Sequence, residues 1–199
     1  MTTTAARSPR DRSSTVAAIL IGLLASGVMV LTASRAAFTD TTDNTGNAIS
    51  TGTVVLVDDD SGSAMFNVAG MAPGDSAVTC IAVTYQGTIT NPGAVRLYSG
   101  GYTDSGTLGA ELNLMVEEGT GSSFGDCSGF TASGTIESGT LAGFDTTHSD
   151  YASGAGTWDP SSTPESRSYR FTVSLPTTAD NSAQGQSITN LTFTWEVQS

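Results

Sequence analysis

The sequence predicts an all-β fold in which two antiparallel sheets pack face to face as a sandwich. The first observation is composition: Gly (23 residues) and Thr are abundant and only 13% of the residues are charged, which is typical of strands joined by many turns. The second is that two segments near the C terminus alternate apolar and polar side chains with a period of two. The third is that further strand-like segments precede them at short intervals, separated by turns.

Residues 51–57 (TGTVVLV) are rich in β-branched side chains and predict the first strand. Residues 58–63 have the composition of a turn and residues 64–68 that of a returning strand, so we expect a hairpin. Asp58, Asp59 and Asp60 lie in its turn. Carboxylates suit Ca²⁺, but the run lacks the alternating spacing of a calcium loop. The sequence therefore favours a solvated turn and leaves a cation site as the alternative.

Residues 77–85 carry apolar or Thr side chains at both parities, which predicts a strand covered on both faces. An Asn-Pro-Gly turn at residues 91–93 separates a strand that ends at Ile89 from a strand at residues 94–98. Residues 111–117 place Leu112, Leu114 and Val116 on one face, as a half-buried strand does.

Residues 118–165 are dominated by Gly, Ser and Thr with scattered aromatic residues, so we expect short strands and long surface loops there. Regular alternation returns in residues 167–175 and 188–197. The apolar side chains that share one face are Tyr169, Phe171, Val173 and Leu175 in the first segment, and Leu191, Phe193, Trp195 and Val197 in the second.

Cys80 and Cys127 are the two cysteines of the chain. In an oxidising compartment an even pair most simply forms one disulfide, which would fasten a loop of the central region to the sheet. The alternative, a metal-binding or nucleophilic cysteine, lacks nearby histidine partners.

The N-terminal region predicts export. Arg7, Arg10 and Arg12 precede an apolar run at residues 16–31, as in a secretory signal peptide. Small residues then favour cleavage between Ala36 and Ala37, although the run is long enough for retention as a membrane anchor to remain an alternative. The expected domains are a signal peptide (1–36), an extended leader (37–50) and a β-sandwich (51–199).

Charge and motifs exclude several functions. The formal net charge is −12 and no lysine is present, so the surface repels phosphate groups and nucleic-acid binding is excluded. His148 is the single histidine; it sits in a loop by composition, near Ser149 and Ser153, without the Gly-x-Ser-x-Gly or His-Glu-x-x-His motifs of hydrolases. The sequence therefore predicts a protein that is not an enzyme and has no cofactor and no metal.

Several stretches, in the right order, resemble the TasA/camelysin (CalY) family of exported proteins. They are residues 37–40 (AFTD), 52–56 (GTVVL), 71–75 (MAPGD) and 184–198 (QGQSITNLTFTWEVQ). The match covers both ends of the mature chain but not the middle, and the two cysteines depart from the family pattern. The resemblance implies removal of the signal by a SipW-type signal peptidase, and a jelly-roll β-sandwich that polymerises into fibres of an extracellular biofilm matrix or the cell surface.

The resemblance also implies how the copies join. Ala37, Phe38, Thr39 and Asp40 would begin a strand that each subunit donates to its neighbour, with Phe38 as the anchoring side chain. A leader of this length spans about 40 Å when extended, and an open sheet edge invites a further strand. Head-to-tail donation does not close, so the product is an open filament. The expected partners are copies of the same chain, the signal peptidase and accessory matrix proteins.

Three alternatives stay open. The first is that the leader is only an unpaired polar segment and is not donated. The second is that the protein is a monomeric surface-tethered adhesin or binding module. The third is that it is a surface metalloprotease of the camelysin type. The last requires metal ligands that the sequence does not display in a known pattern.

Overall fold

The computed structural model describes residues 52–179 and 181–199. The described residues all belong to one compact unit, Thr51–Ser199. The expected cleavage site at Ala36 and Ala37 and the assembly residues Phe38, Thr39 and Asp40 lie outside the described residues. Within the described ranges, no helix has the length and apolar character needed to cross a membrane.

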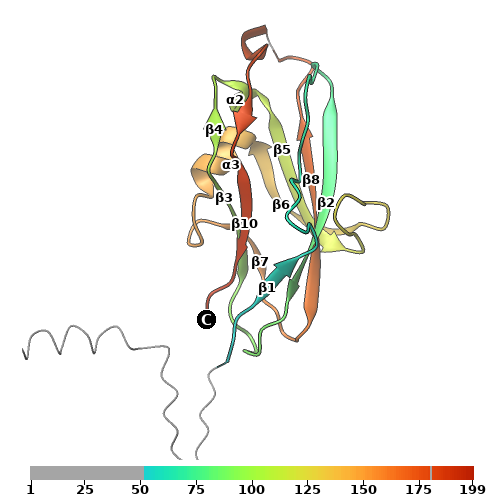
Figure 1. Ribbon diagram of the computed structural model, residues 1–199, viewed down its shortest axis with the longest axis vertical. Coiled ribbons are helices and arrows are strands. Elements are labelled where there is room, and N and C mark those ends of the chain that lie inside the picture. Colours follow the sequence, from blue (N-terminus) through green and yellow to red (C-terminus); the bar gives the residue numbers. More distant parts are fainter. Residues whose placement is uncertain (1–51, 180) are drawn as a thin grey trace, which may run out of the picture. The chain divides into compact units, whose positions relative to one another are not determined.

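The described residues form an all-β domain of antiparallel strands, as the sequence predicts (Figure 1). The strands are β1 (Leu56–Asp58), β2 (Ser76–Tyr85), β3 (Val95–Gly100), β4 (Thr103–Asp104), β5 (Asn113–Thr120), β6 (Thr131–Thr140), β7 (Ala155–Trp158), β8 (Glu165–Ser174), β9 (Ile188–Thr189) and β10 (Thr192–Glu196). The helical segments are α2 (Leu108–Glu111), α3 (Leu141–Thr147) and the 3₁₀ turn η1 (Asn181–Ala183).

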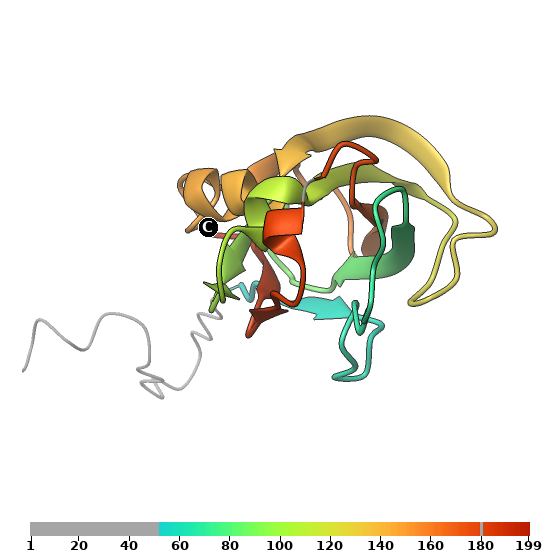
Figure 2. The same ribbon diagram turned by 90° about the horizontal axis from the view of Figure 1, so that it is seen from above.

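Two sheets face each other and enclose the core (Figure 2). The larger has five strands in the order β1-β2-β8-β5-β6, and the smaller has three in the order β10-β3-β7. A separate two-stranded sheet pairs β4 with β9. Every strand pair is antiparallel, so the predicted antiparallel sandwich is confirmed at this level.

The core side of β8 is the one that the sequence predicts. Tyr169, Phe171 and Val173 are buried, as is Leu175 just beyond the strand. Across the core, the Phe171 ring lies 4.7 Å from the ring of Phe193 on β10, between centroids. Burial of these large side chains where the two sheets meet is a main source of stability for the fold.

Strands β2, β3 and β5 lie close to their predicted positions, but the predicted strand that ends at Ile89 is wrong, because β2 ends at Tyr85 and residues 86–94 form no strand. Leu112, Leu114 and Val116 are buried at and before β5, and positive φ angles at Asn91 (55°) and Gly93 (117°) form the turn before β3. Full coverage of both faces of β2 is wrong, because the side chain of Val78 is 52% exposed.

The predicted hairpin of residues 51–57 with 64–68 is wrong. Strand β1 has only three residues and pairs with β2, with Leu56 opposite Tyr85. Residues 64–68 form no strand. Ser61 and Gly62 both adopt positive φ (54° and 78°), which turns the chain away from β1. The side chain of Phe66 then packs on the core, and residues 64–68 do not extend along β1.

The predicted strand at residues 188–197 is interrupted. Asn190 adopts a φ of 60°, a left-handed conformation that Asn tolerates better than most residues. The chain therefore leaves β9, which pairs with β4, and enters β10, which pairs with β3.

The expectation of short strands and long loops within residues 118–165 is wrong for its central part. Strand β6 has ten residues, and α3 follows directly. Thr140 caps α3, since its hydroxyl accepts a hydrogen bond from the Gly143 N–H at 3.0 Å. Phe144 is fully buried and anchors α3 to the sandwich.

Candidate functional site: an open seam between the two sheets

The two sheets of the sandwich meet along two seams. At one seam β6 ends the larger sheet and β7 ends the smaller one. Helix α3 packs against β3, β5 and β6, so its buried Phe144 closes this side. At the other seam the sheet edges are β1 and β10 (Figure 2). We call the gap between β1 and β10 the open seam.

A groove of about 190 Å³ lies in the open seam. Its lining comes from both edges and from β2: Leu56, Val57, Asp58, Val83, Phe193, Thr194 and Trp195. Most of these side chains are apolar, and Val57 is 40% exposed. A second depression, of about 490 Å³, lies over β5, β6 and β8 and is lined mainly by Ser, Thr and Asn. The open seam therefore combines a groove lined mainly by apolar side chains with the two edge strands β1 and β10.

The backbone of β10 presents polar groups to the open seam. On the neighbouring strand β3, the Ser99 N–H donates to the carbonyl of His148, the C-terminal cap residue of α3, at 2.8 Å. The backbone groups of Ser99 therefore point away from β10. Because backbone groups alternate sides along a strand, those of Tyr98 point toward β10, where Tyr98 lies opposite Thr194. The N–H and C=O groups of Phe193 and Trp195 consequently point away from β3, into the seam.

The backbone of β1 does the same from the other side. The Gln86 N–H donates to the Val55 carbonyl at 2.9 Å, so Val55 and, two residues on, Val57 direct their backbone groups toward β2. The backbone groups of Leu56 and Asp58 then face the open seam. Unpaired backbone groups on a sheet edge are the chemistry that binds a further extended chain.

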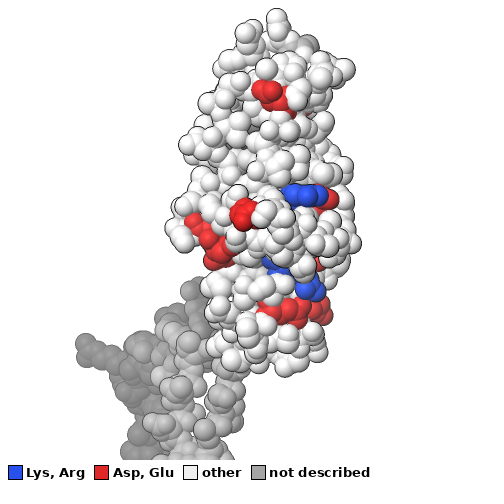
Figure 3. Space-filling view, turned by 90° about the vertical axis from the view of Figure 1, so that its right-hand side faces the viewer, with Lys and Arg blue, Asp and Glu red and all other residues white. Residues whose placement is uncertain are grey.

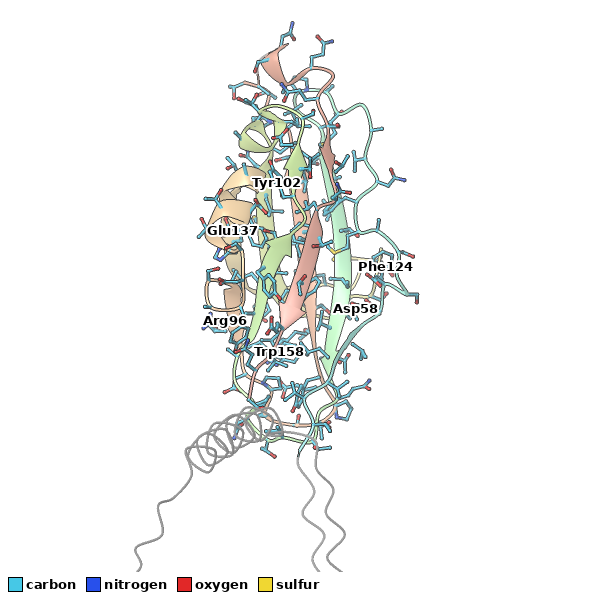
Figure 4. The ribbon with its side chains drawn as sticks, turned by 60° about the vertical axis from the view of Figure 1, so that its left-hand side comes forward. Asp58, Arg96, Tyr102, Phe124, Glu137 and Trp158 are labelled. Atoms are coloured by element: carbon cyan, nitrogen blue, oxygen red, sulfur yellow. A yellow bond between two sulfur atoms is a disulfide. The ribbon has the colours of Figure 1, made fainter. Side chains whose placement is uncertain are left out.

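Asp58 is the ionisable group that lines the groove. Partial burial raises the pKa of its carboxyl, and a hydrogen bond and the negative charge of Asp60 raise it further. Figure 4 shows Asp58 and Phe124 on the same side of the sandwich, opposite Glu137. A strand that enters the seam would therefore pass one acidic group at the end of β1.

The predicted turn at residues 58–63 is present in part: Asp58 ends β1, and the Ser63 N–H donates to the Asp60 carbonyl at 3.0 Å. The prediction that the turn is wholly solvated is wrong, however, because the Asp59 carboxylate accepts two hydrogen bonds from backbone N–H groups. Its Oδ1 accepts from the Ala82 N–H at 2.8 Å, and its Oδ2 accepts from the Phe124 N–H at 2.7 Å. Among residues 52–179 and 181–199, no group of three or more His, Cys, Asp and Glu side chains is arranged to hold a metal.

The predicted disulfide between Cys80 and Cys127 is present, with 5.3 Å between the Cα atoms. It fastens the loop of residues 121–130 to β2, where the Gly125 N–H also donates to the Cys80 carbonyl at 3.0 Å. Together with Asp59, this loop occupies backbone groups of β2 beyond the end of β1. These backbone groups of β2 are therefore not available to a further strand, and the open seam ends there.

His148 lies at the C-terminal cap of α3 and not in a free loop. One ring nitrogen contacts the Ser153 carbonyl oxygen, and the other lies 3.1 Å from Glu137 Oε2. The Ser153 hydroxyl donates instead to Asp150 Oδ1 at 2.8 Å, and Ser149 approaches Ser153 through its backbone N–H. The structure thus does not bring His148 together with a serine hydroxyl as base and nucleophile.

Alternation in residues 188–197 predicts Phe193 and Trp195 as core residues, but it carries no signal that they stand on an open edge. The groove residues Leu56 and Val83 were assigned to strands but to no site. A scan against models of known protein families finds no match for this chain, and a search of curated proteins finds none either.

Proposed function

We propose that this protein is an exported structural subunit that polymerises into extracellular fibres. The N-terminal segment of one copy, beginning at Ala37, occupies the open seam of the next. The observation that carries the proposal is the seam itself, in which two strand edges with inward-facing backbone groups flank a groove lined mainly by apolar side chains.

The leader has the chemistry that this site requires. Residues 37–50 contain Phe38 and Ile49 as their large apolar side chains, among Thr, Asp, Asn and Gly. In an extended segment the backbone would pair with β10 or β1, and Phe38 would pack on the lining at Phe193 and Trp195. The resemblance to the TasA/camelysin family supports the same N-terminal donation and a jelly-roll arrangement of the sandwich.

Export controls assembly in this proposal. A SipW-type signal peptidase cleaves after Ala36, and the leader is then released from the apolar run at residues 16–31. While the run is still attached and in the membrane, Phe38 cannot reach another molecule. The product accumulates in the extracellular matrix or on the cell surface, and accessory matrix proteins join it there.

The test uses the chain that begins at Ala37. Electron microscopy of this protein should show filaments, and deletion of residues 37–43 should abolish them while the cooperative unfolding transition persists. Phe38→Ala should raise the concentration needed for filaments, whereas the matched change Thr42→Ala should leave it unchanged. Filaments that form without residues 37–43 would contradict donation by this segment.

A surface-tethered binding module is the second candidate, and one observation favours it. The large apolar side chains that are most exposed in the described chain are Val55, Val57, Val68 and Val78. Figure 3 shows the side of the molecule on the right of Figure 1, where acidic and basic groups gather in the middle and lower part and uncharged residues cover most of the rest. N-terminal sequencing of the extracellular protein discriminates the two, because a tethered module keeps residues 16–31 and a fibre subunit does not.

A further inference from the structure

Residues 64–71 follow β1 and the turn after it, and Phe66 packs on Phe171, behind the Phe193 side chain of the open seam. Few interactions hold this segment in place. They form no helix or strand, and within the described chain none of their backbone groups takes part in a hydrogen bond. The first hydrogen bonds on either side are from the Ser63 N–H to the Asp60 carbonyl at 3.0 Å and from the Ala72 N–H to Asp75 Oδ2 at 2.8 Å. We call residues 64–71 the covering segment.

Side chains provide the attachment. Met65, Phe66 and Met71 are half-buried against the core, whereas Val68 between them is 48% exposed. The Phe66 ring meets Phe171 edge-on, with 6.5 Å between centroids. Phe171 is also the residue on which Phe193 packs, so Phe66 occupies the aromatic cluster that continues the lining of the groove.

Both ends of the covering segment can act as hinges. Gly62 and Gly70 adopt φ angles of 78° and 69°, which glycine reaches without steric cost. In Figure 1 the chain rises along β2 between these points without pairing to it. The segment can therefore move away from the sandwich without breaking a hydrogen bond of either sheet.

We infer that the covering segment is a displaceable occupant of the seam, and that the N-terminal segment of a second copy replaces it during assembly. The inference rests on the proposed function and names what the acceptor site holds before its partner arrives. An incoming chain paired along β10 passes Phe193, where it meets Phe66. Phe38 of the second copy would replace Phe66 against Phe171, one aromatic ring for another.

The exchange is favourable because the two occupants differ in their backbones. The covering segment leaves the inward-facing groups of β10 unpaired, whereas a strand pairs with them. Each new backbone hydrogen bond adds a net gain in stability, and burial of the Phe38 ring compensates for exposure of the Phe66 ring. Competition by the covering segment also weakens premature pairing of the open edge with another chain, which is a general hazard of exposed strands.

A spin label tests the displacement. The full chain, unprocessed and kept in detergent, carries Val68→Cys as its labelling site, because both native cysteines are joined in the disulfide. A synthetic peptide of residues 37–50 is then added. We expect the label spectrum to change to that of a freely mobile side chain in proportion to bound peptide. The matched label at Val78→Cys, on a strand that stays in place, should not change.

A second variant tests the competition. Phe66→Ala weakens the covering segment, so the dissociation constant of the peptide should fall about tenfold, as when a competing closed state is removed. Val68→Ala, in the same segment but exposed, should leave the constant unchanged. Weaker or unchanged binding to Phe66→Ala, or binding without mobilisation of the label at residue 68, would overturn the inference and leave the proposed function standing. Absence of peptide binding to every variant would overturn both.

Discussion

At the scale of single residues, Asp59 shows how one carboxylate can join distant parts of the chain. Its two oxygens accept from Ala82, 23 residues away, and from Phe124, 65 residues away. The sequence shows only three consecutive aspartates in a turn, and composition cannot distinguish a solvated acid from one that binds backbone N–H groups. The partners become visible only when β2 and the disulfide loop are placed.

Asp59→Ala should lower the free energy of unfolding by about 1–3 kcal/mol, because the Ala82 and Phe124 N–H groups lose their acceptor. Denaturant unfolding monitored by tryptophan fluorescence measures this. Asp60→Ala is the matched control, since Asp60 Oδ1 accepts only within its own turn, from the Gly62 N–H, and it should cost less. Equal losses for the two variants would show that Asp59 does not join the turn to the sheet.

Glu165 predicts a pH dependence. Burial tends to raise the pKa of its carboxyl, but hydrogen bonds from the Trp158 indole and from Ser161, together with the charge of Arg167, outweigh it and lower the pKa from 4.5 to about 2. A carboxyl whose pKa is lower in the folded than in the unfolded protein stabilises the fold at any pH above the unfolded-state pKa. This contribution is lost as the pH falls through the folded-state pKa. The stability difference between the wild type and Glu165→Gln should be constant near neutral pH and shrink between pH 4.5 and about 2. A difference that does not vary over this interval would contradict the assignment.

At the scale of elements, period-two patterns predicted the strands with a buried and an exposed face. Strand β8 is the clearest case, with Tyr169, Phe171 and Val173 all buried. The patterns failed where single backbone conformations decide the path, at Ser61 and Gly62 after β1 and at Asn190 before β10. Helix α3 was missed because its length, seven residues, gives too short a window for helical periodicity.

The disulfide loop predicts a large loss of stability on removal of both cysteines. Cys80 and Cys127 are separated by 47 residues, and closure of a loop of that length contributes about 4 kcal/mol in the chain-entropy model. The Cys80→Ser, Cys127→Ser double variant should lose this amount in denaturant unfolding. The oxidised and reduced wild type provide the control, and a loss below about 1 kcal/mol would show that loop closure is not what the disulfide contributes.

The edge strand β1 predicts a specific defect in assembly. Val57→Glu places a charge in the groove, where an acidic leader containing Asp40 and Asp43 must pass, so filament formation should require at least about tenfold more protein. Val78→Glu, at an exposed position outside the groove lining, is the matched control. Both positions are exposed, so both variants should unfold within about 0.5 kcal/mol of the wild type. Sedimentation of filaments over a concentration series measures the effect, and equal defects would argue against the seam as the acceptor.

At the scale of the whole domain, the two seams of the sandwich differ. Helix α3 closes the seam between β6 and β7, while the short strand β1 leaves a groove between β1 and β10 accessible. The sequence predicted the sandwich, and the family resemblance implied a donated leader, but neither indicated which strands would end the sheets. Which strands end a sheet depends on long-range pairing, such as β1 with β2, and local patterns do not encode that order.

The direct test is an electron cryo-microscopy map of the filaments formed by the chain that begins at Ala37. The account predicts extended density between β1 and β10 of each subunit, continuous with the N terminus of a neighbouring copy and carrying an aromatic side chain near Phe171. A seam filled by the subunit's own leader, or subunits joined elsewhere with the seam vacant, would contradict it.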